Sequence, residues 1–270
     1  MPRSRTCGRR PNWLVEHGDP RDLGRHLSRL WPLYRRRGWF REAQAVLGAA
    51  LRRREVPAPA RAGWHRLLAE AHLQLGEMAP ARDHFERALV LLGSRVPASK
   101  PGWSEMLASQ ALRRPLRRLR AGSPVAQGED RRDRAAEPAA VCWQLFEACW
   151  MLEDQAPLIP LALWGLSLSE RAGRVELVMM NQANLGNVLT ASGHHRLARR
   201  HVRVAVAAAG QTTDPVAITW TQIVASLHWL GVGDWPALDA GLPRALEAGY
   251  GAGCTGPRIR WPSSVPSAAT

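Results

Sequence analysis

The sequence has 270 residues, of which 46% are hydrophobic and 22% charged, the balance of an ordinary soluble globular protein. No run of 18 apolar residues occurs, and no apolar stretch follows the basic N-terminus, so we expect neither a transmembrane segment nor a signal peptide. The four cysteines have neither zinc-site spacing nor a disulfide framework: Cys7, Cys142, Cys149 and Cys254. Together these features predict a cytoplasmic protein.

The formal net charge of +14 is unevenly distributed. Residues 1–60 hold 14 Arg and 5 acidic residues, and residues 111–134 hold 8 Arg and 3 acidic residues. In residues 141–250, by contrast, 7 Arg stand against 9 acidic residues. The basic character is therefore assigned to the N-terminal third and to one further segment, and not to the C-terminal half.

Along the chain, a basic and poorly ordered segment is expected in residues 1–20, followed by helical repeats in 21–120. In the first repeat, Gly38 separates two helices, and in the second Gly76 does so. The packing residues of the first repeat are Leu30, Trp31, Tyr34, Phe40, Ala43, Leu47 and Ala50. In the second, Ala81, Phe85 and Ala88 are spaced by four and three residues, which places them on one helix face.

The middle of the chain is less regular. Residues 107–120 predict a helix in which Leu112, Leu116 and Leu119 share one face and arginines fill the rest. Residues 121–138 contain Gly, Pro and mixed charge with few apolar residues, so we expect a flexible linker there. A degenerate repeat fits residues 141–173.

Two further repeats complete a second helical block in residues 139–248. Their turns are at Gly193 and Gly233, 40 residues apart, just as Gly38 and Gly76 are 38 residues apart. In the first of these repeats, Gly186 is expected to make close contact with the following helix near Ala198. In the second, the expected packing set is Trp235, Leu238, Leu242 and Ala245. Residues 249–270 are rich in Pro, Ser and Gly and are expected to be disordered.

This order of small and large residues resembles the tetratricopeptide repeat family, over about two thirds of the chain. The resemblance implies an all-α fold, a tetratricopeptide-like α-solenoid of antiparallel helix pairs with a period of 38–40 residues. In addition, GEMAPARDHFERALVLLG and WGLSLSERAGRVELVMMNQANLG are similar to the C-terminal helical arm of bacterial signalling proteins. Those proteins carry an AAA/STAND-type ATPase and often a class III adenylate or guanylate cyclase domain.

No set of residues in the sequence predicts catalysis. The phosphate-binding pattern GxxxxGK[ST] is absent, and His194, His195 and His201 have no acidic residue at ligand spacing. We therefore expect no enzyme activity, no catalytic residues, no cofactor and no metal site.

The inner groove of the solenoid is the first candidate binding site, since the first helix of each pair lines the concave face of such arrays. The residues expected to face this groove are Arg25, Arg29, Arg36, Asn184, Asn187, Gln222 and Leu227. A second candidate is a basic patch on the helix at 107–120, formed by Arg113, Arg114, Arg117, Arg118 and Arg120. The alternative for each of these residues is a solvated surface without a ligand.

Three functions remain open. The leading hypothesis is a non-catalytic protein-interaction scaffold or sensor arm of a bacterial signalling system, which binds a protein or peptide in the groove. The second is binding of nucleic acid or an anionic surface by the arginine-rich segments. The third is a fragment of an ATPase or cyclase-type regulator that lacks its catalytic domains. The sequence does not predict the oligomeric state.

Overall fold

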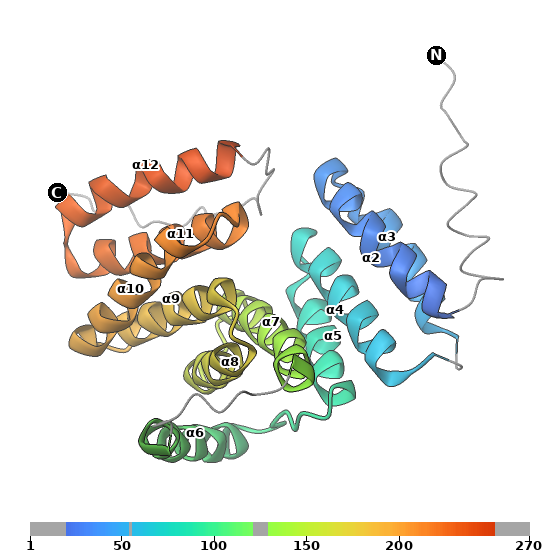
Figure 1. Cartoon of the computed structure of the whole chain (residues 1–270), viewed down its shortest axis with the longest axis horizontal. Helices are drawn as coiled ribbons and strands as arrows, with labels where there is room; N and C mark the ends of the chain where they lie inside the picture. Colours follow the sequence, from blue (N-terminus) through green and yellow to red (C-terminus); the bar gives the residue numbers. More distant parts are fainter. Residues whose placement is uncertain (1–19, 54–55, 121–128, 252–270) are drawn as a thin grey trace.

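The computed structural model describes residues 20–53, 56–120 and 129–251 (Figure 1). Within these ranges the regular structure consists of eleven α-helices and one short 3-10 helix, with no strand. The expected all-α class is confirmed, and the helices pack in sequential antiparallel pairs. No helix in the described ranges is long and apolar enough to cross a membrane. The poorly ordered segments expected at the two ends lie outside the description, apart from Pro20 and residues 249–251.

Five helix pairs follow one another along the chain. The first two are α2 (Pro20–Arg37) with α3 (Phe40–Leu51), and α4 (Ala58–Gln74) with α5 (Met78–Leu91). The remaining three are α7 (Glu129–Met151) with α8 (Leu158–Ala172), α9 (Val175–Ala191) with α10 (His195–Ala208), and α11 (Pro215–Val232) with α12 (Trp235–Gly251). The 3-10 helix η1 (Ala209–Gln211) follows α10.

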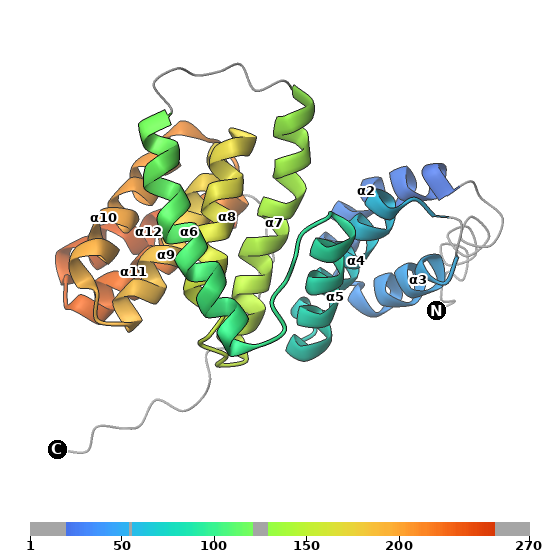
Figure 2. The ribbon, with the colours of Figure 1, turned by 90° about the horizontal axis from the view of Figure 1, so that it is seen from below.

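Helix α6 (Lys100–Arg120) stands outside this pairing. It packs against α8, while α5 packs directly against α7, so the stack of pairs continues past the inserted helix. Figure 2 shows α6 lying along the side of the α7–α8 pair. Trp103 is the buried anchor of α6, with 3% of its surface exposed.

The turns inside four of the pairs depend on the glycines that define the repeat period. Gly38, Gly76, Gly193 and Gly233 all have positive φ, between 67° and 79°. In each turn the residue after the glycine donates its N–H to a carbonyl five residues back, as from His194 to Leu189 at 2.8 Å. This is a helix C-cap that strongly favours glycine, because a Cβ is strained at positive φ.

The linker expected at 121–138 is shorter in the structure. Residues 121–128 lie outside the description, but α7 begins at Glu129, and residues 129–138 are helical. Ala135 and Ala139 in the first half of α7 are buried. The many charged residues of this stretch obscure its small apolar face in the sequence. This face, which includes Ala135 and Ala139, packs against neighbouring helices.

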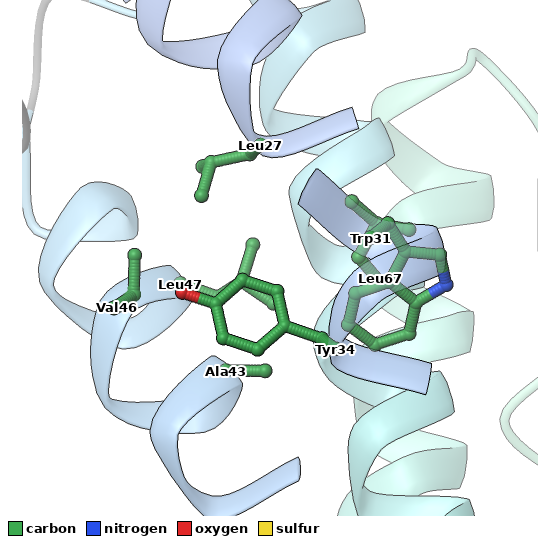
Figure 3. Close-up of a pocket in the computed structure, with 7 residues that line it drawn as sticks. All are labelled: Leu27, Trp31, Tyr34, Ala43, Val46, Leu47 and Leu67. Atoms are coloured by element: carbon green, nitrogen blue, oxygen red, sulfur yellow. The ribbon is translucent and has the colours of Figure 1, made fainter. Parts of the chain in front are cut away.

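The first repeat forms a separate apolar cluster at the N-terminal end of the array. Figure 3 shows how α2, α3 and α4 contribute side chains to it: Leu27, Trp31, Tyr34, Ala43, Val46, Leu47 and Leu67. The gap that they surround has no room for a water molecule. Trp31, Tyr34, Ala43 and Leu47 are therefore in the core, as their spacing predicts.

A polar network on α4 joins the first pair to the third. Glu70, which is 5% exposed, accepts a hydrogen bond from Trp31 Nε1 at 3.1 Å and lies 3.2 Å from Arg35 Nε. Arg66 bridges Glu70 and Glu137 of α7, at 3.7 Å and 2.6 Å. Because these charges have partners, their burial is tolerated, and α2, α4 and α7 are held in one arrangement.

The packing set expected for α12 is only partly correct. Ala245 is buried, but Trp235 and Leu242 are 58% and 46% exposed. The ring of Trp229 on α11 lies where a Cβ of Gly241 would be, so α12 turns Gly241 toward α11 and Leu242 toward solvent. The face that α12 turns toward α11 therefore depends on the missing side chain of Gly241. The repeat pattern does not include this residue.

The close contact expected between α9 and α10 is confirmed. A Cβ added to Gly186 would lie 2.6 Å from Cγ2 of Val202 and 3.4 Å from the carbonyl oxygen of Ala198. Contacts under 3 Å require something to move, and Val202 is a β-branched residue in a helix, with little rotamer freedom. Gly186 therefore sets the distance between the two helices.

We predict that Gly186→Ala lowers the free energy of unfolding by about 1–3 kcal/mol, because it overpacks this crossing, and that Gly186→Leu costs more. Adding Val202→Ala to Gly186→Ala should recover part of the loss, since it removes the methyl group in conflict. Urea unfolding monitored by circular dichroism measures both effects.

The matched control is Gly48→Ala in α3, where a Cβ would meet nothing within 4 Å. That substitution should be neutral or stabilise the protein by up to about 1 kcal/mol, from helix propensity alone. Equal effects of alanine at positions 48 and 186 would contradict the proposed role of Gly186.

Candidate functional site

The polar residues expected in the inner groove are mostly buried between helices. Asn184 is 0% exposed, and its Oδ1 accepts a hydrogen bond from Nε1 of Trp220 at 3.1 Å. Asn187 and Gln222 are 7% and 3% exposed. The expectation that these three amides face an open groove is therefore corrected, because neighbouring helices cover them.

The other expected groove residues are dispersed. Arg29 and Arg36 on α2 are exposed, and Leu227 on α11 is half-buried. The side chain of Arg25 lies outside the description, as do those of the basic patch Arg113, Arg114, Arg117, Arg118 and Arg120. The backbone of α6 runs through that patch, including Pro115. The described side chains of this set do not assemble into one site.

The structure reveals a different cationic surface, on α10. We call it the arginine face; it consists of Arg196, Arg199, Arg200 and Arg203, all of them exposed. Their spacing of three, four and seven residues places them on one side of the helix, over about 10 Å of its length. The opposite side carries the buried residues Ala198, Val202 and Ala205, which fix α10 against the array.

The arginine face carries no compensating negative charge of its own. The sequence of α10, HRLARRHVRVAVAA, contains no acidic residue. Among the described residues, no carboxylate lies within ion-pair distance of these four arginines. Averaging charge over residues 141–250 missed this face, since acidic residues elsewhere in that window balance it. The helical spacing of the arginines is the signal that would have found it.

A polar cleft of about 380 Å³ adjoins the arginine face, between α10, α11 and the start of α12. Its lining residues are Arg199, Val202, Arg203, His228, Trp229, Asp234 and Ala237. The one acidic lining residue, Asp234, precedes α12 and caps its first turn: its Oδ1 accepts a hydrogen bond from the N–H of Ala237 at 3.3 Å. The cleft therefore combines two cationic side chains with an imidazole and an indole ring.

His228 borders this cleft with only 2% of its surface exposed, and hydrogen bonds hold it in a defined orientation. Its Nδ1 lies 2.6 Å from Oγ1 of Thr190, and that hydroxyl donates to the carbonyl oxygen of Gly186 at 2.9 Å. Burial lowers the pKa of His228, and the positive charges of Arg199 and His195 lower it further, against the opposing effect of Asp234. At neutral pH the ring is therefore uncharged.

A group of three histidines lies between α4 and α5, the two helices of the second pair. The Nδ1 atoms of His65 and His84 are 2.8 Å apart, and the rings of His84 and His72 are stacked. His72 Nδ1 lies 2.6 Å from Glu77 Oε2, which accepts a hydrogen bond from Gln44 of α3. In the part of the chain that is described, no three such groups are arranged to hold a metal ion.

Both members of the His65–His84 contact resist protonation. Burial lowers the pKa of His65 to about 4, with further lowering by His84, Arg87 and Arg61. Burial likewise lowers the pKa of His84 to about 4, as do His72 and Arg87. These rings are therefore neutral hydrogen-bonding groups of the interface.

Cys142 and Cys149 are core residues. They are 0% and 1% exposed, and burial raises the pKa of both thiols, that of Cys149 to about 12. A thiol that stays protonated is a poor nucleophile and a poor metal ligand. The packing role expected for these two side chains accounts for their position.

Comparison with known proteins shows the fold and nothing finer. No family model matches the chain, and no curated protein matches it. Among solved structures, the chain is similar to BtubC (BKLC) from P. vanneervenii, with a TM-score of 0.55 over 97% of this chain and 94% of that chain. The two sequences are 18% identical, so the similarity is one of helical architecture.

The His65–His84 contact predicts a loss of stability in acid. Because the folded pKa of about 4 is below the unfolded value of 6.5, the unfolded chain binds more protons between these pH values. The stabilising contribution is fully present above pH 6.5 and is lost as the pH falls toward 4. From pH 7.5 to pH 5, we expect the free energy of unfolding to fall by about 1–3 kcal/mol from this source.

Urea unfolding at both pH values tests this in the wild type, in His84→Gln and in His26→Gln, an exposed histidine of α2. The His84 variant should lose much of the pH dependence, and the His26 variant should keep it. An unchanged pH dependence in His84→Gln would rule out this contact as its source.

Proposed function

We propose that this protein is a non-catalytic, tetratricopeptide-like scaffold that binds an acidic segment of a protein partner on the arginine face of α10. The observation that carries the proposal is the presence of four exposed arginines on one side of a helix, none of which has a described carboxylate within ion-pair distance. Like charges this close repel each other, so a surface of this kind is stabilised when an anion covers it.

Several features support a protein partner. The arginine face is fixed on a rigid helix, because α10 is packed against α9 at Gly186. A rigid cationic face can engage several carboxylates in succession without first ordering its own backbone. The cleft beside it offers apolar surface from Val202, Trp229 and Ala237, which a chain of phosphates and sugars would not use.

A cellular role follows only from the sequence resemblance. The repeat order and the similarity to the helical arm of AAA/STAND ATPase and cyclase proteins lead us to propose a signalling scaffold or sensor arm. In this proposal the chain supplies the interaction surface, and any catalytic domain belongs to a partner or to a longer polypeptide.

Nucleic acid or an anionic surface is the second candidate, and the arginine face favours it as well. Arginine forks bind phosphate as readily as carboxylate, and binding to a polyanion depends steeply on salt. Against this candidate, α10 carries no Phe, Tyr or Trp among the four arginines to stack with bases, and the indole of Trp229 lies in the adjoining cleft. A direct competition between the two ligand classes separates them.

We predict that a fluorescein-labelled peptide of ten glutamates binds the protein at low ionic strength, measured by fluorescence anisotropy. The double variant Arg196→Gln/Arg200→Gln should weaken binding by about tenfold, as expected for two exposed ion pairs of up to about 1 kcal/mol each. Added salt should reduce the affinity of the wild type more than that of the variant.

The charge-matched control is Arg29→Gln/Arg36→Gln, which removes two exposed arginines of α2. It should leave the affinity nearly unchanged. Equal losses in the two double variants would show that net charge, and not the arginine face, attracts the peptide. A ten-nucleotide single-stranded DNA that displaces the peptide at equal concentration would favour the second candidate.

A further inference from the structure

The hydrogen bonds of His228 determine what its free nitrogen can do. We assign the hydroxyl proton of Thr190 to the hydrogen bond with the carbonyl oxygen of Gly186, 2.9 Å away, as is usual for a threonine inside a helix. Oγ1 of Thr190 can therefore only accept from Nδ1 of His228, at 2.6 Å, so Nδ1 carries the proton of the neutral ring. Nε2 is then left with a lone pair and acts as an acceptor.

This arrangement leaves the cleft mismatched to a carboxylate at neutral pH. Arg199 and Arg203 are four residues apart on α10 and line the cleft, so both guanidinium groups can donate to an entering oxyanion. A carboxylate only accepts hydrogen bonds, as does the neutral Nε2 of His228. Two acceptors that face each other repel. If Nε2 takes up a proton, it becomes a third donor beside the two guanidinium groups and attracts the carboxylate.

We propose that the cleft between α10, α11 and α12 seats a single carboxylate of the acidic partner, held by Arg199 and Arg203, and that His228 takes up a proton when the carboxylate enters. The inference rests on the proposed function, since it names the part of the partner that is bound and how acidity controls it. The indole of Trp229 and the side chains of Val202 and Ala237 would contact the methylene groups beside the carboxylate.

The charges around His228 explain why the proton arrives with the ligand. The groups that face the ring are Arg199 and His195 from α10, Thr190 from α9, and Asp234 from the turn before α12. Burial, Arg199 and His195 disfavour protonation of the His228 ring while the cleft is empty, and Asp234 opposes them only in part. An entering carboxylate adds a negative charge beside the ring, which favours the protonated form.

The consequence is binding that strengthens on acidification. One proton taken up per carboxylate bound raises the affinity by up to about tenfold for each unit of pH decrease, while His228 is neutral in the free protein. The glutamates of the peptide stay ionised above about pH 5.5, so the effect is observable between that value and about pH 7.5.

The imidazole C–H resonances of the full chain, followed by NMR through a pH titration, test this directly. The signal of His228 is identified by its loss in His228→Asn, whose side-chain amide keeps a donor for Thr190 and has no titrating group. With N-acetylglutamate amide as the probe, the titration midpoint of His228 should rise. With the neutral N-acetylglutamine amide it should not move.

Affinity for the ten-glutamate peptide provides the second readout. The wild type should bind several-fold more tightly at about pH 5.5 than at about pH 7.5. His228→Asn should lose most of this change, whereas His26→Asn, which replaces an exposed histidine of α2, should retain it. Circular dichroism confirms that each variant is folded.

The outcomes separate the two proposals. If the peptide binds but neither probe moves the midpoint of His228, the inference is overturned and the proposed function stands. The inference is also overturned if His228→Asn keeps the full pH dependence. If the peptide does not bind the wild type at low ionic strength, the proposed function fails, and a midpoint moved by N-acetylglutamate amide would still establish the carboxylate site.

Discussion

The distance between α9 and α10 determines where the proposed binding residues of the C-terminal half lie. Gly186 lets Val202 approach the backbone of α9, and this contact fixes how α10 is rotated about its own axis. With Ala198, Val202 and Ala205 turned inward, the arginines at 196, 199, 200 and 203 must face solvent. The same glycine accepts the hydrogen bond of Thr190, and Thr190 in turn orients His228. The packing of α10 and the orientation of the proposed binding residues therefore both depend on Gly186, a residue without a side chain.

Much of the fold could be predicted from the sequence, because the turn glycines need positive φ and recur at a nearly constant period. The contact at Gly186 was also predictable, since a glycine inside a helix is unfavourable unless a close neighbour requires it. The amides of Asn184, Asn187 and Gln222 were not, because the repeat pattern does not tell which polar residue packs between helices and which faces a groove. The orientation of α12 depends on the ring of Trp229 against Gly241, a single contact that no periodicity encodes.

The candidate site could be predicted only in part, for a reason of scale. The excess of arginine is visible in the sequence, but the net charge summed over long windows predicts basic surfaces only in the N-terminal third and in α6. A binding surface depends on charge over a distance comparable to the screening length, about 10 Å, which on a helix is seven residues. Over this distance, α10 has a clear excess of positive charge, with four arginines and no acidic residue. The cleft beside it brings together α10, α11 and the α12 turn, a combination that exists only after folding.

The insertion of α6 has a consequence for how the chain assembles. Helices α5 and α7 are in direct contact although residues 92–128 lie between them in sequence. Bringing such distant segments together costs conformational entropy that grows only logarithmically with loop length, by about 0.6 kcal/mol for each doubling. The connections on either side of α6 can therefore change in length at little thermodynamic cost, while the α5–α7 contact and the packing of α6 against α8 are preserved. Variation in length between relatives of this chain should accordingly concentrate in these two connections, which join Leu91 to α6 and α6 to Glu129.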